Sequence, residues 1–321
     1  MRTIRLGILG TADIAFRRFL PALKKCDDFE YIGIASRDIN KTRPFIESYG
    51  GIGFSDYDSL IQSELIDAVY IPLPPALHYE WAKKALDNGK HVLLEKPFTT
   101  NLQDSTDLIN KASEAGLALH ENYMFQYHSQ LTEILEVLNS GLIGDIRIIR
   151  SSFGFPLRNG NDFRYNNELG GGAVLDIGGY ITKLATILLG KTIEVKTATI
   201  NNLKNYDVDI FGSVTFENDK GIVFQGAFGM DCYYQCSLGV WGSKGKLYTK
   251  RIFTAPPELK PKLLIETSDD IRELNLSQDD HFEKSIHAFY NSIMDENSRK
   301  KAYNEIILQA ELVSRLQFFD K

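Results

Sequence analysis

Cysteine is scarce in this sequence. Only Cys26, Cys232 and Cys236 occur in 321 residues. A sparse and odd number of cysteines argues against a disulfide framework and favours reduced thiols, as in the cytoplasm. Cys232 and Cys236 are four residues apart, a spacing that could in principle bind a metal, but no histidine or further cysteine lies near them. We therefore expect buried or half-buried thiols and no metal site.

Long apolar runs and excess positive charge are also absent. No run approaches the ~20 apolar residues that a membrane helix needs. The N-terminal stretch MRTIRLGILG has too short an apolar part to resemble a secretory signal. The 36 basic and 42 acidic residues give a formal net charge of −6. Because an acidic chain without a basic cluster suits DNA and RNA poorly, we expect neither a membrane nor a nucleic-acid partner.

What the first third does contain is a regular alternation of two patterns. Apolar strand-like segments are separated by segments whose apolar residues recur at helical spacing. Alternating strands and helices imply right-handed crossovers and a parallel sheet with helices on both faces. We therefore predict an α/β, doubly wound dinucleotide-binding Rossmann domain over residues 1–123. Its strands are predicted at 4–10, 31–36, 67–73, 91–97 and 117–123.

The remaining residues, 124–321, have a different texture. Long strand-like runs follow one another across short turns, which is typical of an antiparallel sheet. We predict a substrate-binding and oligomerisation domain of α+β class, with a large, mostly antiparallel open sheet. Its strands are predicted at 145–155, 192–203, 208–218, 221–230, 233–243 and 245–253, and its helices at 130–139, 172–190, 281–294 and 303–318.

An open sheet with one face covered by helices leaves its other face exposed. The stretches VDIFGSVTF (208–216) and VFQGAFGM (223–230) carry apolar residues that we expect on that exposed face. Exposed apolar surface of this kind favours association between copies. We therefore expect a homodimer or homotetramer formed through the C-terminal sheet.

The segment GILGTADIAF lies where a phosphate-binding turn belongs, after an N-terminal strand and before a helix. The dinucleotide fingerprint needs small residues so that the backbone can approach a pyrophosphate at a helix N-terminus. Of its three glycines only Gly10 is present, with Ala12 and Ala15 at the other positions. We predict cofactor contacts from residues 10–14, namely Gly10, Thr11, Ala12, Asp13 and Ile14; the alternative is a tight turn that binds nothing.

The end of the second predicted strand indicates which dinucleotide is bound. An NAD site usually has an acid there for the ribose hydroxyls, whereas this chain has Ser36 and Arg37. A hydroxyl and a guanidinium suit a 2′-phosphate, so we expect NADP(H) rather than NAD(H). Asp38 could still be a helix N-cap, and Arg37 could be an ordinary solvated side chain.

Glu95 and Lys96 lie at the carboxyl end of the fourth predicted strand, and Pro97 stops it. Ligands of open parallel sheets bind outside the carboxyl ends of the strands, so both side chains would face the cofactor crevice. A lysine there can polarise a carbonyl or transfer a proton, and a neighbouring oxidised nicotinamide would lower its pKa. A surface charge pair is the alternative.

Strand-Glu-Lys-Pro at this distance from an N-terminal nucleotide turn resembles the Gfo/Idh/MocA oxidoreductase family. A second family element, LGGGAVLDIGGYITKLATILLG, supplies Asp176, Gly178 and Tyr180. The resemblance spans nearly the whole chain. Within that family, the chain most resembles the NADPH-dependent nucleotide-sugar 3-ketoreductases. Four stretches carry this resemblance: GTADIAFRRFLPAL, YIPLPPALHYEWAKKAL, ENYMFQYHSQ and FGFPLRNGNDFRYNNELGGGA. Ala12 and Leu73-Pro74-Pro75 stand where most of the family has Gly and Thr-Pro-Asn.

The resemblance implies catalytic roles for three residues. Lys96 would be the central catalytic residue, Tyr180 the proton donor to a ketone oxygen, and Asp176 a group that orients substrate. The chemistry agrees, because a tyrosine with an ordinary pKa near 10 needs a neighbouring cation to donate well. On a regular α-helix, positions 176 and 180 would share one face. The alternatives are a core tyrosine and an aspartate paired with the glycine-rich backbone.

Other candidates contribute less to the argument. Leu73, Pro74 and His78 could line the cofactor pocket, although His78 could equally be a structural cap. Substrate could be bound by Tyr123 and Phe125, with His128 nearby, and by Arg158, Arg164 and Tyr165, whose arginines suit a nucleotide diphosphate. Arg17 and Arg18 could reach cofactor phosphates or be solvated helix residues.

Three functions remain open from the sequence. The first is an NADPH-dependent reductase of a 3-keto nucleotide-sugar in deoxysugar or surface-polysaccharide biosynthesis. The second is an NAD(P)-dependent dehydrogenase of a free pentose or hexose, which would need no long phosphate-binding cleft. The third is a non-catalytic regulator that senses NADP or sugar; the presence of Lys96, Asp176 and Tyr180 argues against it.

Overall fold

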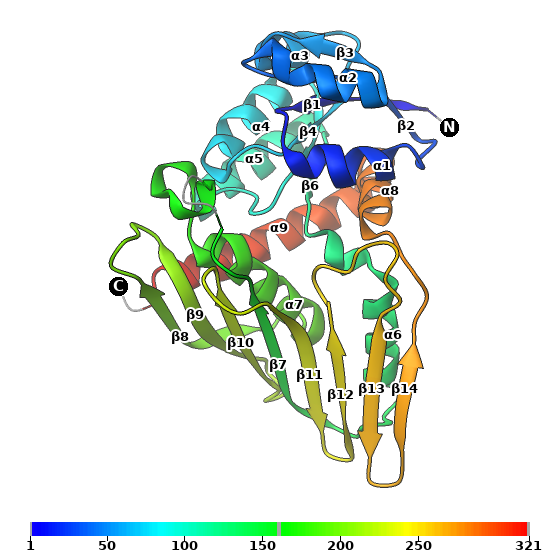
Figure 1. Ribbon diagram of the computed structural model, residues 1–321, viewed down its shortest axis with the longest axis vertical. Coiled ribbons are helices and arrows are strands. Elements are labelled where there is room, and N and C mark those ends of the chain that lie inside the picture. Colours follow the sequence, from blue (N-terminus) through cyan, green and yellow to red (C-terminus); the bar gives the residue numbers. More distant parts are fainter. Residues whose placement is uncertain (1, 159–161, 320–321) are drawn as a thin grey trace. The chain divides into compact units, whose positions relative to one another are not determined.

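A computed structural model describes residues 2–158 and 162–319, which form two compact units (Figure 1). The first unit comprises the chain up to Asn122 together with Phe282–Ala310. The second comprises Tyr123–His281 and the residues after Ala310. The first boundary is within one residue of the expected one. Residues 282–310 were expected in the second domain, but they pack with the first unit.

The first unit contains, within its described residues, a six-stranded sheet of order β3-β2-β1-β4-β5-β6 in which neighbours pair in parallel. The predicted doubly wound parallel sheet is confirmed. The sequence missed one strand, β3, and the helix after it, α3. The strands are β1 (Ile4–Leu9), β2 (Phe29–Ala35), β3 (Ile52–Phe54), β4 (Ala68–Ile71), β5 (His91–Leu94) and β6 (Leu119–Glu121).

Helices cover this sheet because its buried strands present apolar side chains on both faces. Along β4, Val69 and Ile71 belong to a core shared with α3, α4 and α5, whereas Tyr70 points the other way and stacks on Phe19 at 3.8 Å between ring centroids. The elements are a π-helix (Ala15–Phe19), α1 (Leu20–Leu23), a 3-10 helix (Ile39–Thr42), α2 (Arg43–Tyr49), α3 (Tyr57–Gln62), α4 (His78–Asp87) and α5 (Leu102–Ala115).

The C-terminal helices α8 (His281–Met294) and α9 (Glu296–Gln317) return to the first unit up to Ala310. In α8, Phe289 stacks on Phe29 of β2 with ring centroids 6.0 Å apart. In α9, Tyr303 joins the core and its hydroxyl donates to the Leu117 carbonyl. This apolar packing explains why a segment so late in the sequence belongs with the first sheet.

The second unit has, in the described part of the chain, an eight-stranded sheet of order β14-β13-β12-β11-β7-β10-β9-β8. β7 and β10 pair in parallel and all other neighbours are antiparallel, as predicted for this open sheet. The sequence missed β13 and β14. The strands are β7 (Ile146–Gly154), β8 (Glu194–Asn202), β9 (Asp209–Glu217), β10 (Val223–Gly229), β11 (Gln235–Gly242), β12 (Gly245–Lys250), β13 (Lys262–Thr267) and β14 (Ile271–Asn275).

Helices α6 (Ser129–Asn139) and α7 (Gly179–Leu189) also belong to this unit, and α7 packs against β7 and β10. The expected exposure of apolar residues on β9 and β10 is mostly wrong. Their large apolar side chains alternate onto the buried face, and Phe211, 39% exposed, is the main exception. The buried ones are Ile210, Val214, Phe216, Phe224 and Phe228.

One helical stretch is apolar and long enough to be compared with a membrane span, residues Asn167–Leu189. In its most apolar window, 83% is buried inside the structure. It therefore has the character of a core helix.

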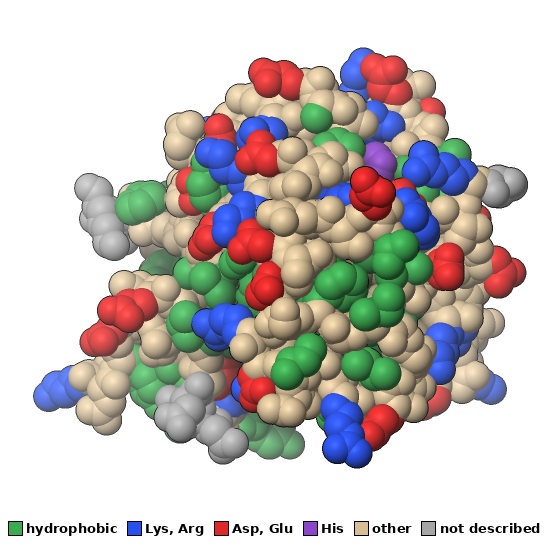
Figure 2. Space-filling model, turned by 90° about the horizontal axis from the view of Figure 1, so that it is seen from above, with side chains coloured by type: hydrophobic (Ala, Val, Ile, Leu, Met, Phe, Trp, Pro, Cys, Tyr) green, Lys and Arg blue, Asp and Glu red, His purple; other side chains and the backbone are tan. Residues whose placement is uncertain are grey.

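On the face drawn in Figure 2, Lys and Arg side chains are interspersed with Asp and Glu and do not gather into a basic stripe.

Candidate functional site

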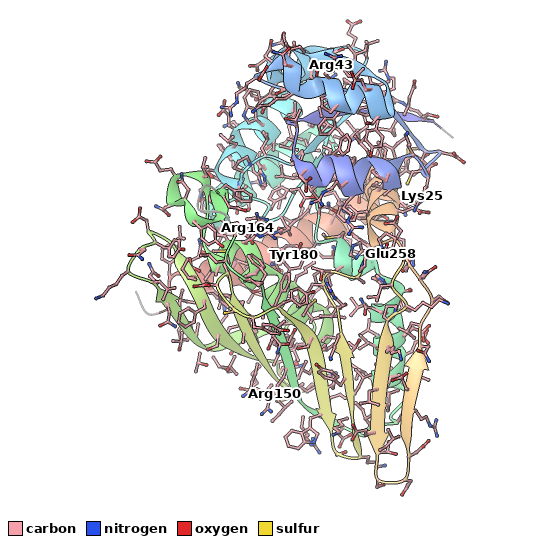
Figure 3. All side chains as sticks on the ribbon, in the orientation of Figure 1. Lys25, Arg43, Arg150, Arg164, Tyr180 and Glu258 are labelled. Atoms are coloured by element: carbon pink, nitrogen blue, oxygen red, sulfur yellow. The ribbon has the colours of Figure 1, made fainter. Side chains whose placement is uncertain are left out.

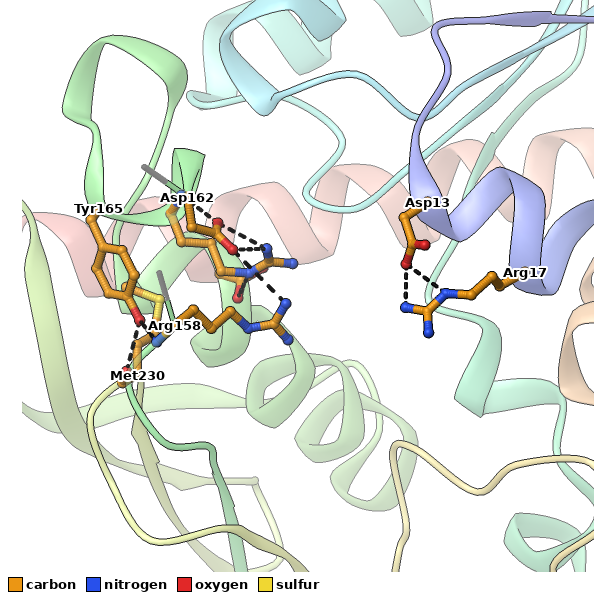
Figure 4. A network of polar contacts seen from close by, with 8 residues as sticks. Asp13, Arg17, Arg158, Asp162, Tyr165 and Met230 are labelled. Atoms are coloured by element: carbon orange, nitrogen blue, oxygen red, sulfur yellow. Dashed lines mark hydrogen bonds and ion pairs between the residues drawn. The ribbon is translucent and has the colours of Figure 1, made fainter. Parts of the chain in front are cut away.

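The turn after β1 brings small residues to the start of a helix, as the fingerprint requires. Gly10 has a φ of 99°, and a Cβ there would lie 2.6 Å from the Leu73 side chain, so only glycine fits. The Ala15 amide donates to the Ala12 carbonyl at 3.0 Å and opens the helical segment. Asp13, by contrast, is exposed and accepts from Arg17 Nε at 2.8 Å (Figure 4).

A pocket of about 420 Å³ joins this turn to the end of β2. Ser36 is buried and its hydroxyl accepts from the Asp38 amide at 3.2 Å, while Asp38 caps the next 3-10 turn. The sequence missed Lys41, a second cation four residues after Arg37. The two cations give the pocket a chemistry suited to phosphate. Its lining residues are Thr11, Ser36, Arg37, Asp38, Lys41 and Tyr57.

Glu95 and Lys96 directly follow β5, at the strand's carboxyl end as predicted. Glu95 Oε1 accepts from the Tyr70 hydroxyl at 2.7 Å and from Asn122 Nδ2 at 2.6 Å. Burial raises the pKa of Glu95, and these two hydrogen bonds, with the Lys96 charge, oppose that rise. The two hydrogen bonds hold the Glu95 carboxyl group beside Lys96 and favour its ionised form, while burial favours the protonated form.

His78 is fully buried at the start of α4 and ties two turns together. Its ring nitrogens lie 2.7 Å from the Leu73 carbonyl oxygen and 2.8 Å from that of Pro97. Burial lowers the pKa of His78. Through these contacts His78 fixes the backbone at Leu73 relative to the backbone at Pro97. A structural role of this kind was one of the two alternatives for His78.

In the second unit, the helix expected at 172–190 is not one regular α-helix. Residues Val174–Gly178 form a π-helix and α7 follows directly. The Val174 amide donates to Asp209 Oδ2 at 2.6 Å, which anchors the start of this segment to β9. Asp176 therefore lies in the π-helical turn and Tyr180 in α7, so the pair spans a change of helix type. π-helical turns of this kind are frequent at functional sites.

Asp176 forms an ion pair with Arg164, which Figure 3 labels. Arg164 Nε donates to Asp176 Oδ2 at 2.7 Å, and its Nη1 donates to Asp162 at 3.1 Å. Burial alone lowers the pKa of Arg164, but the two carboxylates outweigh it and raise the pKa overall. The arginine is thus a permanent cation that orients Asp176.

Tyr180 is 5% exposed and lies in an aromatic cluster. Its ring centroid is 5.1 Å from that of Tyr123 and 5.7 Å from that of Phe125. Its hydroxyl lies 3.8 Å from Met124 Sδ, a weak acceptor. The structure thus brings together Tyr123, Phe125 and Tyr180, but Tyr123 and Phe125 are fully buried and back the Tyr180 ring.

The loop after β7 carries the remaining predicted residues (Figure 4). The Tyr165 hydroxyl accepts from the Arg158 amide at 3.0 Å and donates to the Met230 carbonyl at 3.1 Å, so it anchors the loop. The Arg158 guanidinium lies 3.9 Å from Asp162 and 4.6 Å from the centre of the Phe155 ring. Its side chain is 48% exposed and is the more accessible of the two arginines.

Among residues 2–158 and 162–319, no group of three or more His, Cys, Asp or Glu side chains could hold a metal ion. Cys26 and Cys236 are buried, and Cys232 is exposed. The site chemistry in the described residues therefore consists of a lysine, a tyrosine, carboxylates and arginines. That set suits dinucleotide and phosphate binding together with proton transfer.

Comparison with known proteins places this chemistry in a family. An Actinomadura kijaniata protein named dTDP-3,4-didehydro-2,6-dideoxy-alpha-D-glucose 3-reductase is 38% identical over 98% of this chain and 95% of its own length. D-xylose 1-dehydrogenase (NADP(+)) 2 of Haloferax volcanii is 30% identical over 89% of this chain and 88% of its own.

Solved structures agree. KijD10, a 3-ketoreductase from Actinomadura kijaniata in complex with NADP and TDP-benzene, has a TM-score of 0.95 at 38% identity, covering 98% of this chain and 97% of that one. Residues 4–123 match the oxidoreductase family with an NAD-binding Rossmann fold, and residues 131–248 match the GFO/IDH/MocA C-terminal domain. The chain therefore belongs to the Gfo/Idh/MocA family of oxidoreductases.

Proposed function

We propose that this protein is an NADP(H)-dependent reductase of a 3-keto nucleotide-sugar, acting at C3 in deoxysugar or surface-polysaccharide biosynthesis in the cytoplasm. The observation that carries the proposal is the near full-length similarity to KijD10, a 3-ketoreductase solved with NADP and TDP-benzene. A nucleotide-linked substrate also suits Arg158, a guanidinium whose side chain is 48% exposed.

Each proposed catalytic residue has a distinct task. When bound, the cofactor supplies the hydride. Tyr180 donates the proton to the C3 oxygen, and its hydroxyl lies 3.8 Å from Met124 Sδ, a weak acceptor. Lys96 stabilises the charge that develops on oxygen. Asp176, held by Arg164, orients the sugar hydroxyls.

The cofactor is proposed to lie on the first unit. Gly10 to Ile14 would receive the pyrophosphate at the helix start, and Arg37 with Lys41 would bind the 2′-phosphate in the 420 Å³ pocket. Leu73 and Pro74, held through His78, and Glu95 with Lys96 would border the nicotinamide. This arrangement favours NADP(H) over NAD(H) because a 2′-hydroxyl gives the two cations nothing to neutralise.

The experiment is turnover of a TDP-linked 3-keto-hexose, generated in situ, with NADPH deuterated at the transferable position. Deuterium on C3 of the nucleotide-linked product, read by mass spectrometry, is the expected result. Oxidation of free xylose or glucose with NADP⁺, without turnover of the nucleotide-sugar, would instead favour the activity named for the Haloferax relative. Tight NADPH binding with no turnover of either substrate class would favour a regulator.

A second copy of the chain is the partner we propose for the open face of the second sheet. Trp241 is 57% and Tyr248 40% exposed there. With Ile148, Leu264 and Gly239 they line a hollow of about 360 Å³. Sedimentation should give a dimer or tetramer at micromolar concentration, and Trp241→Lys should shift it toward monomer. A wild-type monomer would overturn this assembly.

A further inference from the structure

A buried chain of hydrogen bonds in the first unit ends on Glu95. Asn122 Nδ2 donates to Glu95 Oε1 at 2.6 Å, and Ser285 Oγ donates to Asn122 Oδ1 at 2.8 Å. His120 Nε2 lies 3.0 Å from Ser285 Oγ. Asn122, Ser285 and His120 are 1%, 1% and 3% exposed. Ser285 comes from α8, 163 residues after Asn122.

The direction of each bond follows from the donors available. Ser285 has one hydroxyl proton, and it goes to Asn122, so its oxygen accepts the Nε2 proton of His120. Asn122 Nδ2 is the atom that faces Glu95, an orientation that suits the ionised carboxylate because the amide oxygen there would be repelled by it. Every bond from His120 onward therefore points toward Glu95, and the Tyr70 hydroxyl adds another from the opposite side at 2.7 Å.

Two charged residues lie near Glu95 along the described chain, Lys96 and Glu121. Lys96 is the next residue in the chain and carries the opposite charge. Glu121, at the end of the neighbouring β6, is engaged by the Phe98 amide, which donates to its Oε1 at 3.0 Å. Donors aimed at a buried carboxylate favour its ionised form, whereas burial disfavours it. The chain from α8 thus opposes the rise that burial causes in the pKa of Glu95.

We propose that His120, Ser285 and Asn122 are positioning residues that keep Glu95 ionised and fixed beside Lys96, so that helix α8 sets the lower pH limit of cofactor binding. The inference rests on the proposed function only in placing the cofactor next to Glu95 and Lys96. An ionised Glu95 attracts the oxidised nicotinamide, which is positively charged, more than the reduced, uncharged ring.

The test is the pH dependence of NADP⁺ and NADPH affinity, measured by calorimetry on the full chain. In Ser285→Ala, Asn122 loses its donor and no longer holds its amide against Glu95. The pKa of Glu95 then rises, so protonation begins at a higher pH. The pH below which NADP⁺ binding is lost should move up by less than about one unit, because the deleted bond acts on the Glu95 charge only through Asn122. NADPH binding should move less.

The matched control is Ser292→Ala on the same helix. Ser292 is also buried, but its hydroxyl donates to the Ala288 carbonyl within α8 and lies outside the chain. Its profile should match the wild type. Asn122→Asp provides a second variant, because a carboxylate against Glu95 should move the pH below which NADP⁺ binding is lost further than Ser285→Ala does.

Two outcomes would overturn the inference. One is that NADP⁺ affinity falls at the same acidic pH in wild type, Ser285→Ala and Asn122→Asp. The other is a uniform loss of affinity at every pH, which a merely structural role would produce. Failure of the proposed function has a different signature, since wild-type protein would then bind neither NADP⁺ nor NADPH at any pH or would not reduce the keto-sugar.

Discussion

The two units hold their polar site residues in different ways. In the first, Glu95 accepts two short hydrogen bonds from buried donors and its neighbours are fixed by further buried contacts. In the second, the Tyr180 hydroxyl meets a thioether, while Arg164 and Asp176 hold one another. The first arrangement fits a site that binds the same cofactor in every turnover. The second arrangement relies on aromatic packing around Tyr180 and on the ion pair between Arg164 and Asp176.

The largest expected effect tests whether the two units serve one reaction. Tyr180→Phe and Lys96→Met should each lower kcat/KM for the keto-sugar by about 10²- to 10⁴-fold, the range for loss of a positioned acid or charge. NADPH affinity, measured by fluorescence, should stay near wild type in Tyr180→Phe. If Lys96→Met retained full turnover, its catalytic role would be excluded and the second unit alone would carry the proton transfer.

An intermediate effect concerns acid stability of the first unit. His91 Nδ1 accepts from the Ala118 amide at 2.9 Å, and burial, with Arg299 and Arg2, lowers its pKa to about 4. The unfolded chain binds the proton near pH 6.5, so stability is lost as pH falls from there toward 4. The free energy of unfolding should drop by about 2 kcal/mol between pH 7 and pH 5 from this group alone.

His91→Asn supplies the control for that drop. An asparagine oxygen can accept from the Ala118 amide but does not titrate, so the variant should lose less stability over the same range. Urea denaturation at both pH values measures the difference. Equal losses in the two proteins would assign the acid sensitivity to other groups. Asp67, whose pKa is lowered to about 2 by Arg5, affects stability only at still lower pH.

The smallest effect tests the 420 Å³ pocket. Arg37→Ala should weaken NADPH binding by about tenfold, because it removes one charge-assisted contact with the 2′-phosphate. NADH binding should be unchanged, since that cofactor has no such phosphate. Lys41→Ala should act in the same direction. A parallel loss for both cofactors would show that the two cations act through the fold of the pocket and not through the phosphate.

Patterns along the chain predicted most of the first unit, because strands such as β4 (Ala68–Ile71) are short apolar runs between helix signals. β3 was missed because it has only three residues, Ile52–Phe54, directly after two glycines. β5 was predicted from its apolar residues, but it ends at Leu94 and not at the predicted Pro97. The hydrogen-bond chain through Ser285 could not be predicted, since its bonds join residues 163 apart and follow no periodicity.

In the second unit the strand pattern was informative but its faces were misassigned. Ile210, Val214 and Phe216 alternate along β9, and all of them lie on the buried side. Which side a helix covers depends on tertiary packing, which a single strand does not encode. The pairing of Arg164 with Asp176, twelve residues apart across a glycine-rich turn, likewise depends on the π-helix that no spacing rule predicted.

The packing of α8 and α9 against the first unit has a consequence for folding of the chain during translation. A ribosome releases the strands of the parallel sheet long before Phe282–Ala310 exists, and domains otherwise tend to fold as they emerge. During that interval Phe29 lacks its stacking partner Phe289, and Asn122 lacks Ser285. The nascent first unit therefore keeps apolar surface exposed until residues 123–281 of the second unit have been translated. Only then can α8 and α9 complete its core.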